Sequence, residues 1–161
     1  MGARIALEAL LYKNAPFLSL TCLCPTLEVN DRENRIKEET LWKETLSKST
    51  TKDFINYWYK KPLFAGFTIP KQRYKQNKAD LLKVMEEYSI LKMPPLAEKL
   101  KSRSIRVGFI YKKNDPKAGP LNNYSHLYFI DATSHAIHIE NSNECSSHIK
   151  SILSVEVKYA Y

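Results

Sequence analysis

Two ionisable side chains in the second half of the chain have the types and spacing of an acid–base pair. Asp115 follows the β-rich run that ends at Tyr111, and His135 comes five residues after the run that ends at Ile130. A carboxylate that binds one imidazole nitrogen fixes the tautomer of the ring, which leaves the other nitrogen ready to exchange a proton. The competing interpretation is that Asn114-Asp115-Pro116 is only a turn and that His135 is a surface loop residue. The residues alone leave both open.

An acid–base pair of this kind needs strands that end at one edge of a sheet. Residues 18–24, 104–111 and 126–130 are the β-rich or apolar runs of the sequence. The segments between them are much longer than two-residue turns, which favours a parallel α/β sheet. Ligands of such sheets bind beyond the carboxyl ends of the strands, so Asp115 and His135 follow strands at the expected place.

The remaining segments predict helices. Residues 1–12 are apolar nearly all round, which predicts a buried helix. Four further helices begin at pairs of capping residues, and a short helix is expected up to Lys101 after Pro94-Pro95. The capped helices span residues 31–47 (Asn30 with Glu33), 54–61 (Thr50 with Asp53), 78–92 (Asn77 with Asp80) and 142–155 (Asn141 with Glu144).

Composition restricts the class of protein. The chain has 161 residues, 43% of them hydrophobic and 26% charged, which is enough for one folded domain. It contains no apolar run long enough to span a membrane and no secretory signal. Three cysteines are too few for a disulfide framework, which favours a reducing, cytoplasmic compartment. We therefore expect no membrane partner.

The net charge of +8 suits nucleic acid or an acidic small molecule. The lysines are scattered along the chain and interleave with acidic residues between Glu28 and Glu44. Residues 57–62 mix aromatic and basic side chains, but the end of a helix that buries its aromatic residues explains them equally well. We do not expect a nucleic-acid partner; a small basic RNA-binding protein stays the third interpretation, and it predicts RNA affinity that falls steeply with salt.

Metal and cofactor sites are not expected either. His135-x-x-His138, Cys145-x-x-His148 and Cys22-x-Cys24 supply possible metal ligands, but their spacing matches no standard zinc pattern. The chain has only four glycines and no glycine-rich phosphate loop. Small cysteines on one face of a strand are common in buried positions.

Five segments, taken in order, resemble the C-terminal part of an α/β-hydrolase, and more narrowly 2-succinyl-6-hydroxy-2,4-cyclohexadiene-1-carboxylate synthase of menaquinone biosynthesis. Residues 1–7 are similar to the segment directly after the nucleophilic serine in that family, and residues 25–35 to its proline-led loop. The Trp-Tyr-x-x-Pro-x-Phe segment at 58–64 is the most specific match. Residues 81–100 resemble its cap helix. Asp115 and residues 134–141, which include His135, take the places of the acid and histidine motifs.

The resemblance implies a fold class and a domain organisation. It implies α/β architecture, namely a partial α/β-hydrolase fold with the last parallel strands and a helical cap. The N-terminal half of the sheet and the nucleophile elbow are missing. The chain would be a single partial domain over 1–161, in which a helical insert at 28–101 separates core segments 1–27 and 102–161.

The resemblance also implies roles for individual residues. His135 and Asp115 become two members of a Ser-His-Asp set. Arg4, Arg35 and Trp58 correspond to positions that contact the substrate, an anionic polycarboxylate. Guanidinium groups suit carboxylates because they bind them with two parallel hydrogen bonds. For Arg32 we prefer a solvated helix face to a binding role.

The serine of the set has no counterpart, because its position would fall directly before Met1. We therefore expect the isolated chain to be inactive as a pyruvate-eliminating lyase. The alternatives are a non-enzymatic, truncated hydrolase-like interaction module, with an apolar strand edge at residues 18–24, and a general α/β-hydrolase of unknown substrate. Nothing in the sequence predicts the oligomeric state.

Overall fold

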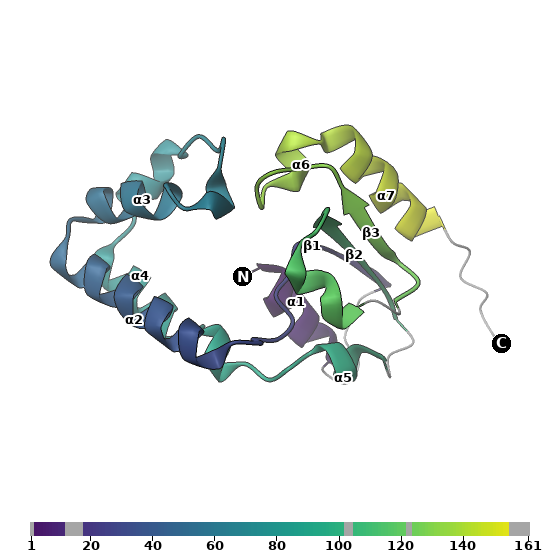
Figure 1. The fold of residues 1–161 in the computed structure, drawn as a ribbon, viewed down its shortest axis with the longest axis horizontal. Helices are drawn as coiled ribbons and strands as arrows, with labels where there is room; N and C mark the ends of the chain where they lie inside the picture. Colours follow the sequence, from purple (N-terminus) through teal and green to yellow (C-terminus); the bar gives the residue numbers. More distant parts are fainter. Residues whose placement is uncertain (1, 12–17, 102–104, 122–123, 155–161) are drawn as a thin grey trace. The chain divides into compact units, whose positions relative to one another are not determined.

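The computed structural model of the protein describes residues 2–11, 18–101, 105–121 and 124–154 (Figure 1). The chain divides into two compact units. The first consists of Met1–Leu27 with Leu96–Tyr161, and the second is Glu28–Pro95. We call them the sheet unit and the helical unit, and we describe each by itself.

The sheet unit is built on three parallel strands. These are β1 (Ser19–Leu23), β2 (Arg106–Lys112) and β3 (Leu127–Ile130), and they pair in the order β1-β2-β3. The register places Cys22 beside Phe109 and Tyr111 beside Phe129. Both pairings are parallel, so the prediction of a parallel α/β sheet is confirmed.

Helices of the sheet unit precede or follow its strands along the chain. They are α1 (Gly2–Leu11), α5 (Ala97–Lys101), α6 (Ile137–Glu140) and α7 (Ser142–Ser154), with a 3₁₀ segment at Pro116–Leu121. In Figure 1, α6 and α7 follow β3 after a loop, and the 3₁₀ segment follows β2. The loops that carry Asp115 and His135 are therefore each anchored by a strand before them and a helical segment after them.

The core of the sheet unit forms where α7 approaches β2 closely. Phe109 and Ile110 of β2 and Ile152 of α7 are fully buried. A Cβ atom on Gly108 would lie 2.4 Å from Cδ1 of Ile152, which is well inside van der Waals contact. Glycine at this position thus lets the Ile152 side chain lie closer to the strand than a Cβ atom would allow without a shift.

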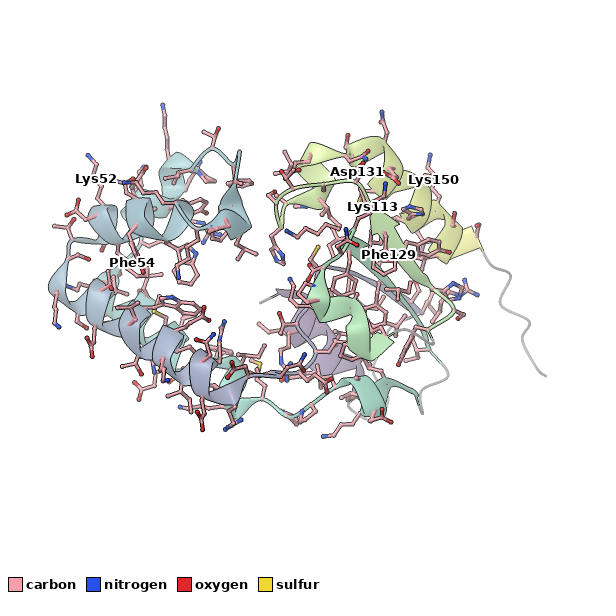
Figure 2. All side chains as sticks on the ribbon, viewed as in Figure 1. Lys52, Phe54, Lys113, Phe129, Asp131 and Lys150 are labelled. Carbon is pink, nitrogen blue, oxygen red and sulfur yellow. The ribbon has the colours of Figure 1, made fainter. Side chains whose placement is uncertain are left out.

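The helical unit consists of α2 (Arg32–Lys48), α3 (Thr51–Tyr59) and α4 (Lys78–Glu87), with 3₁₀ segments at Pro62–Phe64, Lys71–Lys75 and Ile90–Lys92. Leu46, Phe54 and Ile55 form its buried centre. Figure 2 shows Phe54 between α3 and α2, whereas Lys52 points outward from α3.

Most of the predicted helix starts agree with the structure. The hydroxyl of Thr50 accepts a hydrogen bond from the Asp53 amide, and Asn77 accepts from the Asp80 amide. The predicted start at Asn30 is wrong. Asp31 is the residue that caps α2, by accepting from the Asn34 amide. Its carboxylate adds a negative charge at the positive end of the helix dipole.

Two other predicted helices differ from the structure. The helix expected over residues 78–92 ends at Glu87, because the Ser89 hydroxyl donates to Glu39 of α2 and accepts from the Leu91 amide. These side-chain bonds compete with continuation of the helix. The first helix is not buried all round. Ile5 of α1 is 46% exposed, because α1 packs through the face that carries Leu7 and Leu10.

Candidate functional site

Asp115 and His135 lie beyond the carboxyl ends of neighbouring parallel strands. Asp115 is three residues past the end of β2, and His135 is five residues past the end of β3. The two strands point the same way and are hydrogen-bonded to each other, so the segments after them leave the same edge of the sheet. The two groups interact electrostatically, since the charge of Asp115 raises the pKa of His135.

Asp115 is buried and held by the turn in which it stands. Its side chain is 3% exposed. Its amide donates to the carbonyl of Lys112, and its own carbonyl accepts from the Ala118 amide. The carboxylate accepts the Lys117 amide at 3.1 Å on Oδ1, and the Lys117 ammonium lies 3.4 Å from Oδ2. The preceding residue, Asn114, has a left-handed φ of 59°, which asparagine tolerates in tight turns.

His135 is a partly buried neutral imidazole in a positive environment. Its pKa is lowered to about 4, chiefly by burial and next by the charge of Lys117, against the opposite effect of Asp115. Its Nδ1 atom is buried and has no hydrogen-bond partner among the described residues. At neutral pH the ring is therefore in the form that can accept a proton.

The loop that carries His135 is positioned by Glu140. The carboxylate of Glu140 accepts hydrogen bonds from the Thr133 and Ser134 amides, each at 2.8 Å. Hydrogen bonds from Ser134 and Thr133 lower the pKa of Glu140 to about 2. Glu140, the last residue of α6, thus holds the turn that precedes His135 through these two hydrogen bonds.

Two lysines of β2 and its following turn connect this loop to the strand before it. Lys112 donates to the Thr133 carbonyl at 3.0 Å, and the Lys113 ammonium lies 3.5 Å from the Asp131 carboxylate. Figure 2 shows Lys113 and Asp131 side by side beyond the ends of β2 and β3. The acid turn and the histidine loop are therefore held together by contacts that do not involve the acid or the histidine.

Arg4 is placed in the sheet unit, on the buried face of α1. Its Nη1 donates to the carbonyls of Thr26 and Leu27, both at 2.9 Å, and its Nε pairs with Glu8. Burial lowers the pKa of Arg4. These contacts tie α1 to the segment after β1, and its predicted contact with a substrate stays a prediction.

Arg35 and Trp58 belong to the helical unit, where both contact Trp42. The guanidinium carbon of Arg35 lies 4.6 Å from the centre of the Trp42 ring, and the Trp58 ring meets it edge-on at 4.8 Å. Arg35 also pairs with Glu39 at 2.8 Å. Lys61 lies over both tryptophan rings, 4.2 Å from Trp42 and 4.7 Å from Trp58.

The sequence motifs do not assign a role to three residues that contact the candidate site residues: Trp42, Lys61 and Lys117. Trp42 follows Arg35 by seven residues on one helix, so the two-turn spacing is a signal that could have found it. Lys117 follows Asp115 by two residues, but its contact with the carbonyl of Cys24 joins distant parts of the chain and has no sequence signal. Lys61 stands in the Trp-Tyr-x-x-Pro segment, at one of the two positions that this pattern leaves open.

Metal-ligand and nucleophile candidates are accounted for within the described ranges. No group of three or more His, Cys, Asp or Glu side chains is arranged there to hold a metal ion. Cys22, Cys24 and Cys145 are buried free thiols, and burial raises the pKa of each. The buried Ser134 hydroxyl accepts from the Ala136 amide.

In the ranges that the structure describes, no helix has both the length and the apolar composition that a membrane crossing requires.

Comparisons with known proteins confirm the predicted fold. No protein-family model matches the sequence, and no curated protein matches it. Among solved structures the chain is similar to MenH from S. aureus, with a TM-score of 0.76 and 22% sequence identity over 94% of this chain. The match covers 64% of the MenH chain, so this chain spans less than two thirds of the length of that structure. The fold is that of part of a MenH-like α/β-hydrolase.

Proposed function

We propose that this chain supplies the acid, the histidine and the helical cap of an α/β-hydrolase-fold lyase. The reaction would eliminate pyruvate from a polycarboxylate substrate to form 2-succinyl-6-hydroxy-2,4-cyclohexadiene-1-carboxylate. The observation that carries the proposal is the position of Asp115 and His135 after successive parallel strands of a MenH-like fold. The proposal rests on this placement because fold alone does not determine function.

His135 has the properties that a proton-transferring residue of this reaction needs. Its lowered pKa keeps the ring neutral at physiological pH, so it can accept a proton. The charge of Asp115 raises the pKa of His135 and would thus favour the imidazolium that results. The nucleophilic serine would have to come from polypeptide outside this chain, and the chain alone is therefore inactive in our proposal.

The helical unit would bind the carboxylates of the substrate through Arg35. Its guanidinium is held in a fixed orientation by Glu39 and by the face of Trp42, which reduces the conformational entropy lost on binding. Trp58 would provide the apolar side of the same subsite. The overall positive charge of the chain favours association with an anionic substrate.

Tryptophan fluorescence provides a direct test, because the two tryptophans of the chain, Trp42 and Trp58, both lie beside Arg35 or its neighbours. The reaction product is titrated into the purified chain, and emission is followed together with pyruvate release from substrate. We expect a saturable change in emission and no pyruvate. Loss of a charged hydrogen bond, worth about 1.5–3 kcal/mol, should weaken binding at least about tenfold in Arg35→Gln.

Arg32→Gln is the matched control, because Arg32 stands one turn away on α2 and donates to the Leu91 carbonyl at an exposed position. Its binding should equal that of the parent. Equal binding by Arg35→Gln and the parent would contradict the assigned carboxylate subsite. Pyruvate release by the isolated chain would contradict the assigned inactivity.

A second candidate function, a non-enzymatic interaction module, is favoured by one observation. Strand β1 pairs with β2 on one side, and no described strand pairs with its other side. Leu18, directly before β1, is 88% exposed. An unpaired edge favours association with another strand, so size-exclusion chromatography distinguishes the candidates: concentration-dependent dimers support the module, and a compact monomer contradicts it.

A further inference from the structure

The residue that holds the carboxylate of Asp115 is Lys117 rather than His135. Lys117 engages both carboxylate oxygens: its backbone amide donates to Oδ1 at 3.1 Å, and its ammonium lies 3.4 Å from Oδ2. Asp115 is almost completely buried and Lys117 is only 26% exposed. A charge pair so shielded from water is stronger than a surface pair.

Lys117 is itself held in place from a third direction. Its ammonium also donates to the carbonyl of Cys24 at 3.4 Å. Cys24 directly follows β1 and has a left-handed φ of 44°, a conformation that is uncommon for a residue other than glycine. One ammonium group therefore ties the segment after β1 to the turn after β2, with Asp115 between them.

His135 is left without the partner that an acid–base pair would give it. Its Nδ1 is buried without a hydrogen-bond partner among the described residues. Burial is the largest cause of the lowered pKa of His135; among the charges that act on the imidazole, Lys117, the N-terminal ammonium and Lys112 lower its pKa and Asp115 raises it. A buried polar atom without a hydrogen-bond partner is energetically costly. While Lys117 contacts the Asp115 carboxylate, Nδ1 of His135 lacks the hydrogen bond that an acid–base pair would give it.

We propose that Lys117 is a positioning residue of the acid–base pair: it holds the carboxylate of Asp115 between the segments that follow β1 and β2, and its charge disfavours the imidazolium form of His135. The inference rests on the proposed function only in taking Asp115 and His135 as that pair. Two effects of Lys117 both lower the pKa of His135. It places a positive charge near the imidazole, and it occupies the carboxylate that would otherwise stabilise the imidazolium.

The test is the pKa of His135 in the whole chain, measured by NMR titration of the imidazole proton, whose signal is assigned as the one absent from His135→Asn. In Lys117→Gln the positive charge and its contact with Oδ2 of Asp115 are lost, while the backbone amide still donates to Oδ1. We therefore expect the pKa of His135 to rise by about one unit. In Lys117→Arg the charge is kept, and the pKa should stay close to that of the parent. Circular dichroism of each variant shows that it is folded.

Two further variants separate the direct effect of the Lys117 charge on His135 from the effect of its contact with the Asp115 carboxylate. Asp115→Asn should lower the pKa of His135, and the rise caused by Lys117→Gln should be smaller in that background, because no carboxylate is left to free. Lys113→Gln is the matched control. Lys113 pairs with the exposed Asp131 and is not among the charges that act on His135, so the pKa of His135 should not change.

An unchanged pKa of His135 in folded Lys117→Gln would overturn the proposal, and so would a rise in Lys117→Arg equal to that in Lys117→Gln. If Lys117→Gln does not fold, Lys117→Met takes its place: a raised pKa of His135 in Lys117→Met with an unchanged pKa in Lys117→Arg supports the proposal, and equal values in the two variants overturn it. These measurements use no substrate, so they can fail while the binding test of the proposed function succeeds, or the reverse.

Discussion

The candidate sites of the sheet unit and the helical unit hold their charged side chains by different physical means. In the sheet unit, Asp115 and Glu140 accept hydrogen bonds from backbone amides, and Lys112 and Lys117 donate to carbonyls beyond the strand ends. Around the tryptophans of the helical unit, Arg35 and Lys61 lie on aromatic faces. Arg35 pairs with Glu38 and Glu39 and stacks on Trp42, and Lys61 lies over the tryptophans.

This contrast indicates which unit can keep a reacting group fixed. Contacts to backbone atoms position a side chain relative to the sheet, which suits an acid and a base whose geometry must be exact within fractions of an ångström. Contacts on an aromatic face position a cation relative to another side chain rather than to the backbone, and each is worth only about 0.5–1 kcal/mol at an exposed site. Such contacts suit recognition of a flexible anionic substrate.

The largest effect should come from the core under the acid turn. Phe109→Ala removes a fully buried ring that meets Tyr124 edge-on at 5.3 Å, and should lower the free energy of unfolding by about 3–5 kcal/mol. Urea unfolding measures this. Phe129→Ala, on the neighbouring strand at a side chain that is 40% exposed, is the control and should cost much less.

The same variant also tests whether the two units are independent. Native tryptophan emission should be unchanged in Phe109→Ala, because both tryptophans belong to the helical unit. It should shift in Phe54→Ala, because the Phe54 ring lies 5.8 Å from that of Trp58. A shift of equal size in both variants would contradict the assignment of the two rings to separate units.

A smaller loss is expected where α7 meets β2. Gly108→Ala places a methyl group 2.4 Å from the Ile152 side chain, and overpacking of this kind costs about 1–3 kcal/mol. Thermal unfolding should show a lower midpoint. Gly119→Ala, whose Cβ would meet nothing within 4 Å, should be close to neutral. Equal thermal midpoints of Gly108→Ala and Gly119→Ala would contradict the close packing of α7 on β2.

The turn around His135 should depend on the ionisation of Glu140. Its pKa is lowered to about 2, below the value of an unfolded glutamate, so its stabilising effect is complete above about pH 4.5 and is lost as pH falls towards 2. Glu140→Gln should remove this dependence and cost about 1 kcal/mol at neutral pH. Amide exchange at Thr133 and Ser134 measures it, and exchange that is insensitive to both pH and substitution would exclude the role.

The smallest effect should be in the helical unit. A double-mutant cycle of Lys61→Met and Trp42→Leu should give a coupling free energy of about 0.5–1 kcal/mol, which is typical of a cation on an exposed aromatic face. Lys60→Met, one residue earlier and exposed, should show no coupling to Trp42. A coupling of several kcal/mol would show that the cation is fixed as rigidly as those of the sheet unit.

The parts of this molecule that depend on local pattern could be predicted from the sequence. The apolar run at residues 18–24 and the β-rich runs that end at Tyr111 and Ile130 place all three strands, and turn chemistry places Asp115 after one of them. The caps at Thr50 and Asn77 follow from the spacing of a side-chain acceptor to an amide three residues on.

The parts that depend on contacts between residues far apart in the chain could not be predicted from the sequence. Ser89 ends the helix early by bonding to Glu39, fifty residues away, and no local feature of residues 78–92 indicates it. The hold of Lys117 on Cys24 requires the ends of two strands to meet. For the same reason the resemblance assigned Asp115 and His135 to one acid–base pair but gave no sign that a lysine contacts the carboxylate.

His135 must be a partly buried neutral base beside Lys117 and Asp115 if the chain supplies the acid and the histidine as proposed. The pH titration of its imidazole in the unmodified chain measures this state without any substitution at the site. The signal is identified by its absence in His135→Asn and is followed by NMR from about pH 3 to pH 8, a range that spans both the lowered and the ordinary pKa of histidine. We predict a midpoint near pH 4, since burial lowers the pKa of His135 to about 4. A midpoint near the value of a solvated histidine, about 6.5, would contradict the assignment.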